Sequence, residues 1–144
     1  MIGVGNAYRG DDAAGLVVAR RLRERGVEAI EQEGEPVALI DVFAARDAVV
    51  LVDAVQSGAP PGTVHRFDVS DGPLPRELRG STSTHAVGLG EAIELARALG
   101  RLPPRVVVYG VEGARFATGV GLSYEVEAAL APLVEAISGE LPGA

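Results

Sequence analysis

Three polar side chains, Asp12, Asp53 and His85, have the types and positions that metal binding requires. Asp12 follows a short apolar segment and a turn, Asp53 ends the apolar run 48–52, and His85 opens a segment with helical spacing. In a parallel α/β sheet, ligands bind beyond the carboxyl ends of the strands, where such residues meet. Imidazole suits Zn, Cu, Fe and Ni, and carboxylates add negative charge. The three residues therefore predict a divalent-metal site at one sheet edge, with positions left open for substrate or water.

Each of the three residues also has a purely structural interpretation. Asp12 could lie in the first turn of a helix, where the helix dipole favours an acid. Asp53 could cap a turn, and His85 could cap a helix or bond a carbonyl group. The other histidine, His65, falls on a segment that we expect to be an exposed strand, and we expect no function for it. The run 81–84 beside His85 is interpreted as a polar loop that caps a helix rather than as a source of a nucleophile.

Other motifs that carry chemistry are incomplete or absent. Gly3-Val4-Gly5 begins like a dinucleotide-binding loop, but the third glycine of that motif would fall at Tyr8. The sequence has no G-x-S-x-G elbow and no H-E-x-x-H helix. It has no lysine, which excludes a P-loop and a lysine nucleophile, and no cysteine, which excludes thiol catalysis and disulfides. No side chain is an evident nucleophile.

The elements that must position these residues alternate between strands and helices. Apolar runs predict strands at 1–5, 27–31, 48–52, 63–69 and 105–110, and helical spacing predicts helices at 13–25, from 35, from 84 and at 123–138. Asp11 and Ser123 are the expected N-caps, and Gly26 the expected stop. This alternation is typical of a single α/β domain over residues 1–144. We expect a three-layer α/β/α sandwich with a twisted, mostly parallel sheet of about five strands.

Two strands depart from the regular pattern. The segment 63–69 follows its predecessor after a short turn, whereas a parallel crossover needs about a dozen residues, so we expect it to be antiparallel. The segment 1–5 is at the short end of the usual strand length of about 5–6 residues. We therefore expect the natural chain to begin a few residues earlier.

Composition restricts the partners. The chain has 144 residues, 47% of them hydrophobic, and a formal net charge of −7 with no basic run. This argues against nucleic acid and anionic membranes as partners. No apolar run approaches the ~20 residues of a membrane span, and no basic start precedes an apolar stretch as in a signal peptide. We expect a cytoplasmic monomer.

The order of several motifs resembles the hydrogenase maturation endopeptidases. Gly3-Val4-Gly5-Asn6 with Asp11-Asp12 and Gly15 is similar to their opening motif, and 51–55 to their second. Residues 84–89 resemble their third motif, while 109–112 and 121–123 resemble their last strand and the loop before the final helix. The resemblance is collinear over nearly the whole chain.

The resemblance implies an aspartic-type endopeptidase that removes a C-terminal extension from the large-subunit precursor of a [NiFe] hydrogenase after nickel insertion. It assigns nickel binding to Asp12, Asp53 and His85, which are also the best candidates for catalysis, since the sequence offers no evident nucleophile. We assign substrate binding to Asn6 and Asp11. The nickel is expected to arrive with the substrate, and another divalent metal could replace it in vitro.

Two other functions remain open from the sequence. The same three residues could belong to a non-enzymatic, chaperone-like module that binds the metal of the same precursor. They could also serve a small-molecule α/β metalloenzyme, although no phosphate or nucleotide motif supports that function.

Overall fold

The computed structural model describes residues 1–33, 36–43, 46–70, 72 and 89–140. Its elements, in chain order, are β1 (Ile2–Val4), η1 (Gly10–Ala13), α1 (Ala14–Glu24), β2 (Ile30–Gln32), η2 (Pro36–Ala38), α2 (Leu39–Val42), β3 (Ala48–Val55), β4 (Val64–Asp68), α4 (Leu89–Ala98), β5 (Arg105–Glu112) and α5 (Tyr124–Glu140). None of the helices in these residues is long and apolar enough to cross a membrane.

The five strands form one sheet in the order β2-β1-β3-β5-β4. The pairs β1–β2, β1–β3 and β3–β5 are parallel, and β4 pairs antiparallel with β5. The expectation of one antiparallel strand is thus confirmed. Its neighbour is β5 rather than the preceding strand β3, because β5 lies between the two in the sheet.

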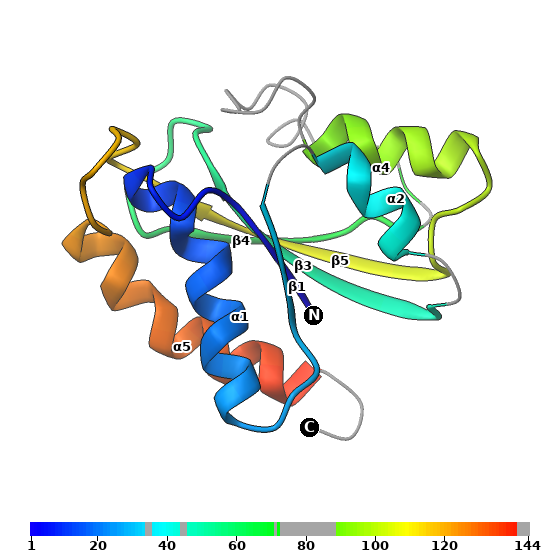
Figure 1. The fold of residues 1–144 in the computed structure, drawn as a ribbon, viewed down its shortest axis with the longest axis horizontal. Helices are drawn as coiled ribbons and strands as arrows, with labels where there is room; N and C mark the ends of the chain where they lie inside the picture. The colour runs from blue at the N-terminus through cyan, green and yellow to red at the C-terminus, as the bar shows by residue number, and fades with distance from the viewer. Residues whose placement is uncertain (34–35, 44–45, 71, 73–88, 141–144) are drawn as a thin grey trace.

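Helices cover both faces of the sheet, as Figure 1 shows: α1 and α5 lie on one side, and α2 and α4 on the other. Alternate side chains of β3 enter two separate cores, Val50 and Val52 with α1 and α5, and Val49 and Leu51 with α2 and α4. A strand buried on both faces needs the continuous apolar run that the sequence shows here. The α/β/α sandwich is therefore confirmed.

Glycines let the first turn and helix α1 approach the sheet at backbone distance. A Cβ atom on Gly5 would lie 1.9 Å from the carbonyl oxygen of Asp12, and one on Gly15 would lie 2.4 Å from that of Val52. Only a residue without a side chain fits such contacts. Gly5, which belongs to the incomplete nucleotide-binding motif of the sequence, thus allows Asp12 to lie against the end of β1.

Two expectations about element ends were wrong. Helix α1 has Ala13 as its N-cap, with no side-chain cap, because the 3-10 turn η1 precedes it; Asp11 is therefore not the N-cap. Strand β3 continues to Val55, so Asp53 lies within the strand rather than at its end, because the parallel pairing with β5 runs through all eight residues. Ser123 does precede α5, and its Oγ accepts a hydrogen bond from the Val126 amide at 3.4 Å.

Candidate active site at the carboxyl edge

Asp12 lies on the turn that follows β1. Its backbone N–H donates to the Arg9 carbonyl at 3.0 Å, and its own carbonyl accepts from the Asn6 amide at 3.2 Å. These bonds, together with the close contact at Gly5, fix the backbone of Asp12 beside the end of the strand. The residue is buried although it carries a carboxylate.

Asp53 enters the same region from the neighbouring strand β3, and it is also buried. Its Oδ1 accepts a hydrogen bond from the Ala54 amide at 2.9 Å. Burial, and then the negative charge of Asp12, raise the pKa of Asp53 well above its ordinary value. Two buried carboxylates that repel one another are stabilised by a shared proton or by a cation. The structure thus brings together two of the three residues predicted for metal binding.

The third predicted ligand, His85, lies outside the residues that the structure describes. Within the described ranges, no three His, Cys, Asp or Glu side chains are grouped so that they could hold a metal ion. The metal assignment to Asp12, Asp53 and His85 therefore stays a prediction, and Asp12 and Asp53 are the two of these residues that the structure describes.

Asp11, next to Asp12 in the sequence, fastens a distant loop. Its Oδ2 accepts hydrogen bonds from the amides of Ala114 and Arg115, at 2.6 and 2.9 Å, and its Oδ1 accepts one from Ser123 at 2.6 Å. Burial alone would raise the pKa of Asp11, but these backbone N–H groups outweigh burial and lower it. Asp11 is fully buried, so any effect on substrate binding acts through the loop 113–123.

Asn6, the other predicted substrate-binding residue, lies on the partly exposed turn after β1. Its Oδ1 accepts a hydrogen bond from the Tyr8 amide at 2.9 Å, which shapes the turn that carries Asp12. Its role in substrate binding stays a prediction.

Glu112, a further buried carboxylate at the end of β5, fastens the loop after β3 in the way that Asp11 fastens the loop 113–123. It accepts hydrogen bonds from the backbone amide and hydroxyl of Ser57, and its Oε1 lies 3.0 Å from His65 Nε2. The His65 ring also stacks on Phe67, and its side chain is only 19% exposed. His65 thus lies on a half-exposed edge strand, as expected, but its own ring is partly buried because Glu112 and Phe67 hold it against the sheet.

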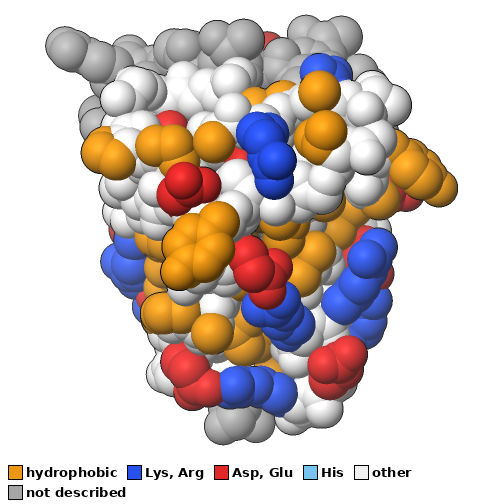
Figure 2. All heavy atoms as spheres, turned by 90° about the vertical axis from the view of Figure 1, so that its left-hand side faces the viewer, with side chains coloured by type: hydrophobic (Ala, Val, Ile, Leu, Met, Phe, Trp, Pro, Cys, Tyr) orange, Lys and Arg blue, Asp and Glu red, His pale blue; other side chains and the backbone are white. Residues whose placement is uncertain are grey.

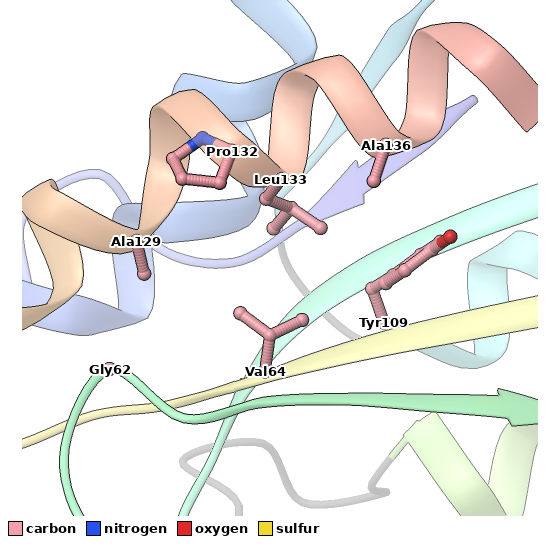
Figure 3. Close-up of a pocket in the computed structure, with 7 residues that line it drawn as sticks. All are labelled: Gly62, Val64, Tyr109, Ala129, Pro132, Leu133 and Ala136. Atoms are coloured by element: carbon pink, nitrogen blue, oxygen red, sulfur yellow. The ribbon is translucent and has the colours of Figure 1, made fainter.

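An apolar pocket of about 430 Å³ lies between α5 and the strands β4 and β5 (Figure 3). Its walls include Val64, Tyr109 and Leu133. Tyr109 packs in the core that α1 and α5 cover, whereas Asp53 alternates with Val50 and Val52 and so points to the opposite face. The pocket is therefore separate from the acid pair.

Comparison with known proteins connects this architecture with a family. Residues 17–140 match the family model described as hydrogenase maturation protease. The chain belongs to the hydrogenase maturation protease family. This confirms the resemblance seen in the motifs, and it identifies the fold as that of a peptidase family.

Individual relatives agree with the family. The chain is 27% identical to the hydrogenase 2 maturation protease of Escherichia coli, over 98% of this chain and 88% of that protein. It is 28% identical to the hydrogenase expression/formation protein HupD of Thiocapsa roseopersicina, over 94% of this chain but only 63% of that protein. The structure of the hydrogenase maturating endopeptidase HybD from E. coli superimposes with a TM-score of 0.82 and 27% identity, over 97% of this chain and 89% of that one.

Within this protease fold, the sequence did not reveal that Glu112 and Asp11 fasten loops, although Asp11 was singled out for other roles. Glu112 follows an apolar strand just as Asp53 was expected to, so the same signal was present in the sequence. The contacts of Asp11 had no such signal, because its partners lie more than a hundred residues away along the chain.

Proposed function

We propose that this protein is an endopeptidase that removes the C-terminal extension of a nickel-loaded [NiFe] hydrogenase large-subunit precursor, and that it reads the substrate's nickel as its recognition element. The reaction is the hydrolysis of one peptide bond: one water is consumed, and the extension leaves with a new amino terminus. Membership of the hydrogenase maturation protease family supports the class of substrate.

The observation that carries the proposal is the buried acid pair Asp12–Asp53 at the carboxyl edge of the sheet. Mutual repulsion disfavours two negative charges in this place. A divalent cation that arrives on the substrate would neutralise both, so that binding would distinguish a metal-loaded precursor from an empty one. Carboxylate oxygens are acceptable ligands for nickel, and an imidazole such as that of His85 would improve the set.

In this arrangement the metal orients the scissile bond while the protein supplies ligands. Three protein ligands would leave coordination positions for the substrate's own groups or for water. The sequence offers no cysteine and no serine elbow, so the groups that assist the attack of water are sought among Asp12, Asp53 and His85. The raised pKa of Asp53 favours its protonated form, and a protonated carboxyl group can donate a proton.

The test uses Asp12→Ala and His85→Ala with nickel-loaded precursor, and mass spectrometry to follow loss of the extension. Asp41→Ala, at an exposed aspartate on α2, is the matched control for the first variant, and His65→Ala is the control for the second. Wild type and controls should trim the precursor, while both site variants should fold and leave it intact. Normal trimming by either site variant would contradict the proposal. Binding by wild type without any change in precursor mass would indicate a chaperone-like module instead.

A further inference from the structure

The arginines of this acidic protein divide into two groups. Nine of those in the described ranges form ion pairs with carboxylates: Arg20, Arg21, Arg23, Arg25, Arg46, Arg66, Arg97, Arg101 and Arg105. Arg9 and Arg115 are the two arginines of this part of the chain that pair with no acid, and each instead donates to a backbone carbonyl. A guanidinium has five N–H donors, so one such bond leaves most of them available.

Both of these arginines lie on one surface, which we call the paired-loop surface (residues 6–11 and 113–124). Arg9 Nε donates to the Phe116 carbonyl at 3.2 Å, and the Gly119 amide donates to the Tyr8 carbonyl at 2.9 Å. The carboxylate of Asp11 adds its bonds to the loop 113–123. The two segments are therefore joined, although they lie about a hundred positions apart in the sequence.

The paired-loop surface also carries the two most exposed large hydrophobic residues of the described chain. These are Tyr8, 75% exposed, and Tyr124, 84% exposed. Figure 2 shows the face that includes loop 113–123 and α5, where hydrophobic side chains form a band between charged ones. Tyrosine and arginine are the residue types that contribute most at protein–protein interfaces. Neither tyrosine ring is buried in a core, so the fold itself does not explain them.

The charge of the surface indicates what kind of partner it fits. The chain has a net charge of −7, yet its two arginines without acid partners in the described residues both lie here. An acidic partner would supply the carboxylates that these guanidinium groups do not find among the described residues, and a fork-shaped guanidinium can bind a carboxylate through two hydrogen bonds. The surface also adjoins the acid pair, because Asp12 donates its backbone N–H to Arg9 on the same turn.

We infer that the paired-loop surface docks an acidic segment of the protein substrate and so holds the precursor beside Asp12 and Asp53. This rests on the proposed function, since the substrate is the hydrogenase large-subunit precursor. Arg9 and Arg115 bind carboxylates of that segment, and Tyr8 and Tyr124 pack against its apolar atoms. The acid pair Asp12–Asp53 binds the metal of the precursor, and the two arginines bind its acidic segment.

The test measures the dissociation constant of nickel-loaded precursor for wild type, the double variant Arg9→Gln/Arg115→Gln and Arg9→Lys/Arg115→Lys. Arg25→Gln, at an exposed and ion-paired arginine on the C-cap of α1, is the matched control. Two exposed ion pairs lost together should weaken binding by about tenfold at low salt. The lysine variant should recover most of the loss because it keeps the charge, and high salt should reduce the difference because it screens exposed charges.

Three results would overturn the inference. The first is equal affinity of wild type and the glutamine variant. The second is a loss that lysine does not restore and salt does not reduce, since that pattern indicates loosening of the loop. The third is dimerisation of wild type, measured by sedimentation, that the glutamine variant abolishes, since the surface would then bind a second copy. Trimming of the precursor is recorded in parallel: if wild type does not trim it, the proposed function fails, whereas trimming with unchanged affinity in the variants overturns only the docking inference.

Discussion

Replacing Asp11 tests whether a buried carboxylate holds the loop that borders the candidate site. Its two oxygens accept three hydrogen bonds from backbone amides, all at 2.6–2.9 Å. Asp11→Ala removes all three acceptors. Asp11→Asn keeps an oxygen on one side only, and turns an NH₂ group toward an amide that also needs an acceptor.

The expected loss follows from these contacts. The Ser123 amide is buried and would remain without a partner, while the amides of Ala114 and Arg115 are partly reached by water. An unsatisfied buried donor costs about 1–3 kcal/mol, and a hydrogen bond to a charged acceptor contributes about 1.5–3 kcal/mol. Because the hydrogen bonds of Ala114 and Arg115 are only partly buried, we count them at less than full value. We expect Asp11→Ala to lower the free energy of unfolding by about 3 kcal/mol and Asp11→Asn by about 1–2 kcal/mol.

Urea unfolding at neutral pH measures both values, with Asp41→Asn as the exposed control. The pKa of Asp11 lies below its ordinary value of 3.8, so the ionised carboxylate stabilises the fold above that pH. The stabilisation is lost as the pH falls through the lowered pKa. The difference between wild type and Asp11→Asn should therefore narrow in acid. A loss below about 1 kcal/mol for Asp11→Ala would show that these hydrogen bonds do not hold the loop, and so would a difference that stays constant as the pH falls.

Three further substitutions should change the stability of the fold or the processing of the precursor. Asp53→Asn should raise the free energy of unfolding at neutral pH, because burial and the charge of Asp12 favour a neutral side chain at this position. In wild type, the stability that the protonated Asp53 contributes is lost as the pH rises through its raised pKa. Processing of the precursor by Asp53→Asn should fall by at least about tenfold. Gly15→Ala places a Cβ 2.4 Å from a backbone oxygen and should cost about 3 kcal/mol in thermal unfolding, whereas Gly139→Ala, which meets nothing within 4 Å, should cost nothing. Glu112→Ala should cost about 2–3 kcal/mol in urea unfolding, more than Ser57→Ala, because it removes every acceptor on that carboxylate.

Much of the fold could be predicted because its signals are local. The continuous apolar runs of β3 and β5 indicate strands buried on both faces, and the alternation in β4 indicates an edge strand. The position of β4 beside β5 is not local, since closeness in sequence favours pairing with β3. The two buried runs take the centre of the sheet together, and that leaves the half-exposed strand at its edge.

The residues of the candidate site could also be predicted in part, but their long-range contacts could not. Asp12 and Asp53 stand out in the sequence because a carboxylate next to a buried apolar strand is costly unless it has a partner or a function. The structure brings the two residues together. The part played by Asp11 depends on amides that only folding brings near it. The contact that partly buries the His65 ring was not predictable, because its partner Glu112 lies 47 positions further along the chain.

The most direct test of the account is cleavage of the precursor by wild-type protein, with and without nickel loading, followed by mass spectrometry. We expect the nickel-loaded precursor alone to lose its C-terminal extension, and the empty precursor to keep its mass. Equal trimming of both forms would contradict the central claim that the acid pair Asp12–Asp53 reads the metal of the substrate.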